Sequence, residues 1–132
     1  MYIRWFKDIT IKDVPVVGGK NASLGEMYRY LAPKGVNIPN GFAITAKAYF
    51  DFLEKGGIKK EIGRILKELN PKSIKSLQKG GKAIRDLILK TPLPKEVETE
   101  IIKDYLKLSS DYQEENTDVA VRSSATAEDL PS

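Results

Sequence analysis

The sequence contains neither cysteine nor histidine among its 132 residues. Without cysteine, the chain can form no disulfide, no thiolate zinc site and no cysteine nucleophile. Without histidine, it lacks the commonest general base and metal ligand, and no Ser-His-Asp triad can form. These two absences exclude thiol chemistry and histidine-based catalysis from this chain.

Long hydrophobic runs are missing as well. The longest apolar run is a few residues, whereas a membrane-spanning helix needs about 20. Residues 1–5 lack the apolar core of a secretory signal peptide. We therefore expect a soluble, cytoplasmic protein with no membrane partner.

The residues that are present have the composition of a globular domain. Hydrophobic residues make up 41% and charged residues 30% of the chain, which is not the composition of a disordered protein. The 22 Lys and Arg stand against 18 Asp and Glu, so the net charge is +4. Because the two signs interleave, as in residues 59–61, we predict a solvated mixed surface and no nucleic-acid binding.

Hydrophobic periodicity predicts an α/β (α+β) fold, rich in helix and with a few short strands. Apolar residues at helical spacing predict helices at 21–31, 45–55, 58–69, 74–88 and 97–108. Aromatic and β-branched residues predict strands at 2–6, 42–45 and 118–122, and an extended stretch at 13–17. Thr45 is expected to cap the helix that follows it, and Gly80-Gly81 allows a kink in the helix at 74–88.

The first candidate site lies where two glycines and a lysine precede a helix. Gly18 and Gly19 would let backbone N–H groups approach an anion, and the helix N-terminus would add unpaired donors. Lys20 would add an ammonium group, which makes this segment a candidate phosphate cradle. It is not a Walker A loop, because the spacing differs and Asn21 follows the lysine. A plain Gly-Gly turn with a solvated lysine is the alternative.

The second candidate site follows the predicted strand at 118–122. Arg122 stands at the end of that strand, where open α/β sheets place ligands, and its planar guanidinium suits bidentate contact with phosphate. Ser123, Ser124 and Thr126 follow with hydroxyls that can donate to phosphate oxygens. Alternatively, Thr126 and Asp129 form a capping pair that begins a helix, and Arg122 pairs with a nearby carboxylate.

Three blocks of the sequence resemble the N-terminal nucleotide-binding domain of the phosphoenolpyruvate synthase (pyruvate, water dikinase) family. They are residues 17–27, 38–45 and 121–132, and their order and spacing match as well. The resemblance implies that residues 1–132 are a single, first portion of an ATP-grasp-like nucleotide-binding domain. The family's phosphohistidine and pyruvate-binding domains are expected outside this chain.

The resemblance also implies a reaction, in which ATP, pyruvate and water give AMP, phosphoenolpyruvate and phosphate through a phosphohistidine. This is a step of gluconeogenesis and requires magnesium. Because the chain has no histidine, we expect it to be inactive alone, with ATP and the missing domains as its partners. The magnesium ligands are likewise expected outside it, and none of its residues is expected to be catalytic.

Carried over residue by residue, the resemblance implies the following ATP-phosphate-binding residues: Lys20, Arg122, Gly18, Gly19, Ser123 and Ser124. Rifampin phosphotransferase has nearly the same two motifs, and pyruvate phosphate dikinase usually carries glycine at the second serine. The equivalent segment of either enzyme, or a non-catalytic helical binding module, therefore remains an alternative. We further expect Lys20 and Arg122 to face one cleft. We also expect residues 123–132 to be poorly fixed, because chain ends without packing partners are generally disordered.

Overall fold

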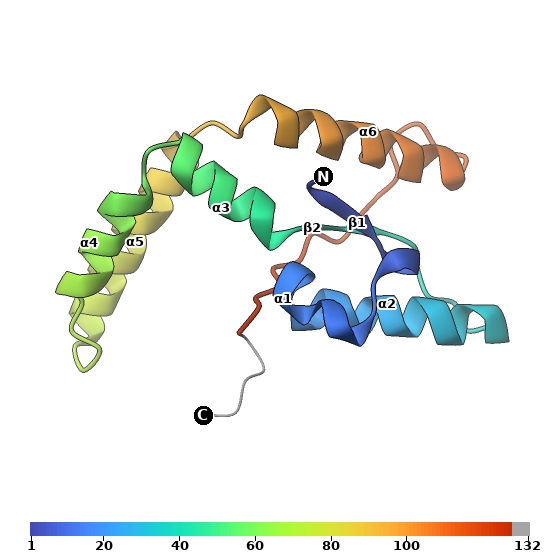
Figure 1. Ribbon diagram of the computed structural model, residues 1–132, viewed down its shortest axis with the longest axis horizontal. Helices are drawn as coiled ribbons and strands as arrows, with labels where there is room; N and C mark the ends of the chain where they lie inside the picture. The colour runs from blue at the N-terminus through green and yellow to red at the C-terminus, as the bar shows by residue number, and fades with distance from the viewer. Residues whose placement is uncertain (128–132) are drawn as a thin grey trace. The chain divides into compact units, whose positions relative to one another are not determined.

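The computed structural model describes residues 1–127 (Figure 1). Asp129, half of the predicted capping pair, lies outside these residues. The described elements are β1 (Ile3–Trp5), α1 (Val14–Val17), α2 (Gly19–Leu31), β2 (Phe42–Ile44), α3 (Ala46–Lys55), α4 (Lys59–Glu68), α5 (Ile74–Lys90) and α6 (Lys95–Asp111). Short 3-10 helices cover Phe6–Asp8, Ile11–Asp13 and Ala32–Lys34. The predicted helix-rich α+β fold is confirmed.

The chain divides into two compact units. The first unit combines residues 1–49 with those from 96 onward, and the second unit is residues 50–95. The second unit carries twelve Lys and Arg and five Asp and Glu, a net charge of +7. The rest of the chain, with ten Lys and Arg against thirteen Asp and Glu, has a net charge of −3. No described helix combines the length and the apolarity needed to cross a lipid bilayer.

The first unit is built on a two-stranded sheet. β1 and β2 run antiparallel, with Trp5 opposite Phe42, and the centroids of these two rings lie 5.4 Å apart. The strands predicted at 2–6 and 42–45 are confirmed, each shorter than the predicted range. The buried core beside the sheet consists of Phe6, Ile9, Val17, Ala22 and Ala43.

Helix α2 turns its smallest residues to this core. Ala22 and Gly25 are buried, and a Cβ added to Gly25 would lie 2.6 Å from the Cβ of Ile9. Ile9 is fully buried, so it occupies the space into which a larger side chain on α2 would point. The apolar residues Met27 and Leu31, whose spacing predicted this helix, are more exposed, at 38% and 36%.

Three local predictions are corrected by the structure. The stretch predicted as extended at 13–17 is helical, because Thr10 and Asp13 form a capping box and Pro15 is tolerated in the first turn. Residues 118–122 form no strand, since no described strand lies beside them to complete a ladder. The Thr45 hydroxyl does not cap α3: its Oγ1 is buried and has no hydrogen-bond partner among the described residues.

The second unit is a small helical assembly with its own core. Phe52, Leu53, Ile58 and Ile62 are buried in it, and Ile84, Leu87 and Ile88 of α5 pack against them. Helix α5 is uninterrupted through its two glycines. Gly80 is buried, and a Cβ there would lie 2.5 Å from Cδ2 of Leu69, so this glycine permits close packing and no kink.

Candidate functional site

Gly18 joins α1 to α2 in a conformation that only glycine adopts readily. Its φ is +83° and its ψ is 163°, and it occupies the N-cap position of α2 without a side chain to cap the helix. Its own N–H donates to the carbonyl of Val14 at 2.8 Å, which closes α1. The sequence therefore places a helix start here, as predicted, but with no cap from its own residues.

The C-terminal segment supplies what α2 lacks. Ser124 Oγ accepts a hydrogen bond from the backbone N–H of Asn21 at 3.3 Å and donates one to the carbonyl of Val17 at 3.0 Å. The N–H of Gly19 donates to the carbonyl of Ala125 at 3.2 Å. Figure 1 shows the red end of the chain returning to the start of α2. The two segments singled out in the sequence are thus in contact.

Lys20 takes part in the same contact through its side chain. Its Nζ donates to the carbonyl of Ser123 at 3.3 Å, so the ammonium group lies next to the residue that follows Arg122. Both Lys20 and Arg122 are exposed. These two residues thus lie on the two segments that meet at the start of α2.

A groove of about 870 Å³ runs along the first unit beside this contact. Its lining includes Asn21, Leu24, Phe42, Arg122 and Ser124. Lys20 is not among the lining residues. Arg122 lines this groove and Lys20 does not, so the expectation that Lys20 and Arg122 face one cleft is not borne out here, although their segments are in contact.

The N–H groups at the start of α2 are largely engaged by the chain itself. Gly19 and Asn21 donate to Ala125 and Ser124, so the expectation of unpaired donors is not met at these two residues. The phosphate-binding role of this segment therefore stays a prediction, and it depends on the side chains of Lys20 and Arg122.

Residues 123–125 make hydrogen bonds within the chain, so the expectation that they lack packing partners is not met; that residues 123–127 are poorly fixed stays a prediction. The hydroxyl of Ser124 and the carbonyl of Ala125 both bond the start of α2. The expectation also covered residues 128–132, which lie outside the described residues.

Helix α6 anchors the chain that leads into this segment. The hydroxyl of Tyr105 donates to the carbonyl of Thr117 at 2.8 Å, and the N–H of Thr117 donates to Oγ of buried Ser109 at 3.1 Å. The N–H of Asn40 donates to the hydroxyl of Tyr112 at 2.7 Å. The sequence predicted the helix that carries Tyr105 but indicated nothing about these polar contacts.

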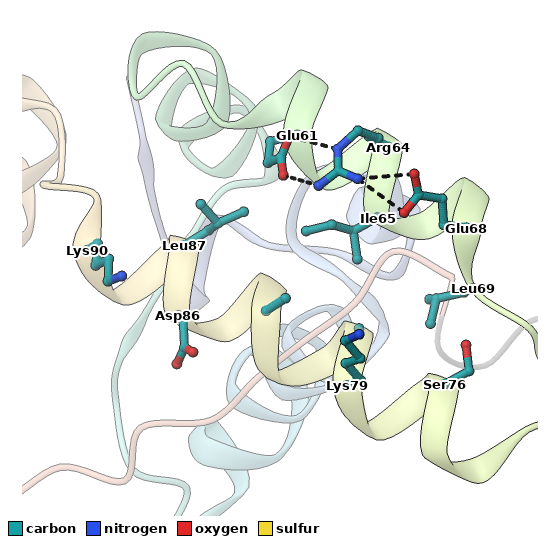
Figure 2. Close-up of a pocket in the computed structure, with 12 residues that line it drawn as sticks. Glu61, Arg64, Ile65, Glu68, Leu69, Ser76, Lys79, Asp86, Leu87 and Lys90 are labelled. Atoms are coloured by element: carbon teal, nitrogen blue, oxygen red, sulfur yellow. Dashed lines mark hydrogen bonds and ion pairs between the residues drawn. The ribbon is translucent and has the colours of Figure 1, made fainter.

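A second hollow, of about 580 Å³, lies between α4 and α5 in the second unit (Figure 2). Figure 2 shows Arg64 between Glu61 and Glu68, with Ile65 and Leu87 reaching into the space between the helices. The hydrogen bond from Arg64 lowers the pKa of Glu61, and the two glutamates raise the pKa of Arg64. These groups lie at the i, i+3 and i, i+4 spacing of exposed ion pairs, which agrees with the predicted solvated surface.

The described residues contain no cluster of three or more Asp, Glu, His or Cys side chains that could hold a metal ion.

The comparisons with known proteins agree with the motifs. Residues 14–132 match the family described as "Pyruvate phosphate dikinase, AMP/ATP-binding domain", and the chain belongs to that family. Phosphoenolpyruvate synthase of Aquifex aeolicus is 51% identical to this chain over 130 residues, and that of Helicobacter pylori is 49% identical over 130 residues. Phosphoenolpyruvate synthase of Escherichia coli is 45% identical over 129 residues.

These alignments cover almost all of this chain but little of each relative. Each includes 98% of the chain and 15% or 16% of the relative's own length. The resemblance inferred from the sequence blocks is confirmed, and this chain matches one small portion of a much longer enzyme.

Proposed function

We propose that this chain is the ATP-binding portion of a phosphoenolpyruvate synthase. The membership of the nucleotide-binding family and the identity to synthases along almost the entire chain support this proposal. The whole reaction consumes ATP, pyruvate and water and yields AMP, phosphoenolpyruvate and phosphate. Histidine phosphorylation and pyruvate binding belong to other domains of the same polypeptide, and the enzyme acts in the cytoplasm.

The observation that carries the proposal is the contact between the two motif segments. Lys20 reaches the carbonyl of Ser123, although 103 positions separate them, so its ammonium group approaches the backbone next to Arg122. A triphosphate carries several negative charges and needs positive donors that converge from different segments. Two exposed cations on adjoining segments meet that requirement.

Within this site, Lys20 and Arg122 bind the phosphates by charge. The guanidinium supplies two parallel N–H donors, whereas the ammonium acts as a mobile point charge. Gly18 and Gly19 carry no side chains themselves, so the segment that follows Arg122 packs directly against their backbone, and Ser123 adds an exposed hydroxyl. Magnesium, when bound, neutralises phosphate charge and aligns the transferred group. As the resemblance implies, its protein ligands are expected in other parts of the enzyme.

The first experiment is isothermal titration of the 132-residue chain with Mg-ATP. Charge-assisted hydrogen bonds contribute roughly 1.5–3 kcal/mol each, and two of them give about millimolar affinity once the costs of association are subtracted. We expect weak or undetectable binding and no catalysis. Micromolar binding would contradict the idea that this portion supplies only part of the site.

The second experiment uses the full-length enzyme that carries this segment. Lys20→Ala and Arg122→Ala should each lower ATP-dependent phosphorylation of the carrier histidine roughly 10- to 100-fold while pyruvate binding stays intact. Lys34→Ala removes an exposed lysine beyond the other end of α2 and is the matched control. Near-normal phosphorylation in Lys20→Ala or Arg122→Ala would overturn the assignment. Transfer to rifampin, or a requirement for phosphate as co-substrate, would instead identify one of the alternative enzymes.

A further inference from the structure

We propose that Ser124 is the N-cap of helix α2, supplied from the far end of the chain, and that it thereby positions Arg122 beside Lys20. Ser124 is then a positioning residue and not a phosphate ligand. The inference rests on the proposed function, because it assigns a purpose to the contact between Lys20 and the residue that follows Arg122. It adds a residue whose role follows from hydrogen bonds and not from a motif.

The geometry at Ser124 is that of a helix cap. A capping side chain accepts a hydrogen bond from the N–H of the second or third residue of the helix. With Gly18 at the N-cap position, Asn21 is the third helical residue, and its N–H donates to Ser124 Oγ at 3.3 Å. The bond that a serine at position 18 would make locally is made here by a serine 103 positions after Asn21.

The absence of a side chain at Gly18 makes room for the cap from Ser124. A Cβ on residue 18 would lie 2.8 Å from the carbonyl carbon of Ser124 and 3.0 Å from the nitrogen of Ala125. Real Cβ atoms do not approach other atoms so closely, so a side chain at position 18 and the segment at 124–125 exclude each other. The absence of a local cap and the presence of the distant one are two parts of a single arrangement.

The hydroxyl of Ser124 has no proton left for a phosphate. A serine hydroxyl has one O–H donor, and Ser124 donates it to the carbonyl of Val17 at 3.0 Å. That same carbonyl also accepts from Nδ2 of Asn21 at 2.9 Å, which ties the helix start to the end of α1. Contact between Ser124 and a phosphate would require this hydrogen bond to break.

Three consecutive residues fix the backbone just after Arg122. The carbonyl of Ser123 accepts from Lys20, the hydroxyl of Ser124 caps α2, and the carbonyl of Ala125 accepts from Gly19. We name residues 123–125 the capping segment. Of these three residues of the capping segment, Ser123 and Ala125 use backbone carbonyls and Ser124 uses its side chain. Substituting Ser124 therefore loosens the capping segment without altering Lys20 or Arg122.

The test compares Ser124→Ala, Ser124→Thr and Ser110→Ala in the full-length enzyme. Alanine removes the cap, threonine keeps a hydroxyl, and Ser110 is an exposed serine on α6 that serves as the matched control. Hydrogen exchange followed by mass spectrometry reports on peptides that cover residues 17–24 and 117–127. Steady-state kinetics give KM for ATP, KM for pyruvate and kcat.

We expect Ser124→Ala to speed exchange in both peptides about fivefold, as loss of one helix cap allows, and to raise KM for ATP by a similar factor. KM for pyruvate and the values for Ser110→Ala should stay at the wild-type level, and Ser124→Thr should restore most of the ATP effect. A purely structural role would lower the amount of active enzyme without moving KM for ATP.

Unchanged KM for ATP in Ser124→Ala, together with faster exchange, would overturn the positioning role while leaving the cap. Unchanged exchange in that variant would overturn the cap itself. Failure of the proposed function is distinguishable, because Lys20→Ala and Arg122→Ala would then bind Mg-ATP like the wild type. The exchange measurement would still decide whether Ser124 caps α2.

Discussion

The backbone N–H of Tyr2 donates a 2.7 Å hydrogen bond to the carboxylate of Glu100, 98 positions further along the chain. The bond joins the residue just before β1 to the second turn of α6. The carbonyl of Tyr2 accepts from the N–H of Thr45 at 2.9 Å, so the same residue also meets the end of β2. The first unit is thus closed by contacts between its first residues and segments on both sides of the second unit in sequence.

Replacing Glu100 should weaken this closure. Glu100→Ala leaves the partly buried N–H of Tyr2 without its acceptor and should cost roughly 1–3 kcal/mol of unfolding free energy. Glu100→Gln keeps a carbonyl acceptor and should cost less. Glu115→Ala, at an exposed glutamate after α6, is the control. Urea unfolding gives the free energy of unfolding of all three variants. Equal free energies for Glu100→Ala and Glu115→Ala would show that the hydrogen bond contributes nothing to stability.

Gly18→Ala should be far more costly than Gly35→Ala. Both glycines have positive φ, +83° and +87°, but nothing lies within 4 Å of a Cβ on Gly35. Gly35 has ψ near 4°, in the left-handed helical region, where a side chain costs about 1–2 kcal/mol. Gly18 lies in a region almost restricted to glycine and also faces Ser124, so we expect roughly 3–5 kcal/mol. Thermal unfolding of the two variants gives the difference, and similar losses would contradict the close approach of the capping segment.

Thr45→Val should stabilise the protein. Thr45 is 5% exposed, and its buried hydroxyl finds no partner among the described residues. Valine has nearly the same shape and removes the unsatisfied group, which should gain about 1 kcal/mol. Thr99→Val, at an exposed position of α6, should change little. A loss of stability in Thr45→Val, measured by urea unfolding, would mean that the hydroxyl caps α3 after all.

Asp13 should make stability depend on pH in the acid range. The hydrogen bond from the backbone N–H of Thr10 lowers the pKa of Asp13, assisted by the Thr10 hydroxyl and by Arg4 against the opposing effect of burial. A lowered folded-state pKa means that the stabilisation is complete above the unfolded pKa of about 4. It is lost as the pH falls through the folded value.

The comparison variant for Asp13 is Asp13→Asn. The free energy of unfolding of the wild type should exceed that of Asp13→Asn by roughly 1 kcal/mol at pH 7. This difference should shrink progressively below about pH 4. Thr10→Ala, which removes the hydroxyl partner of Asp13, should reduce the pH dependence. Unfolding curves between pH 2 and 7 provide the measurement, and a gap that widens in acid would reverse the inferred sign.

The helices could be predicted from sequence because their stability depends on patterns within one segment. Val97 and Leu108 of α6 repeat at helical spacing, and both are buried as expected. The segment at 118–122 could not be predicted in this way. A strand exists only with a neighbour, and Val121, 93% exposed, shows that β-propensity alone leaves the segment without regular structure here.

The candidate site, too, could be predicted only where a local sequence pattern marked it. The motifs identified both segments, and their contact agrees with the resemblance that linked Lys20 with Arg122. The cap from Ser124 could not be predicted, because a distant serine leaves no local pattern. One signal was present: Gly18, at the N-cap position of α2, has no side chain to accept a hydrogen bond from the first N–H groups of the helix, and this leaves room for an acceptor from another segment.

The net charge of +4 is the sum of net charges of opposite sign on the two units. Residues 50–95 carry +7, and the remainder carries −3. At pH 7 the two units therefore carry net charges of opposite sign, strongly positive in the second unit and weakly negative in the first. At low ionic strength it should be retained by exchangers of both signs, through different parts of its surface. At 0.15 M salt, where charges are screened beyond about 8 Å, both attractions fade together.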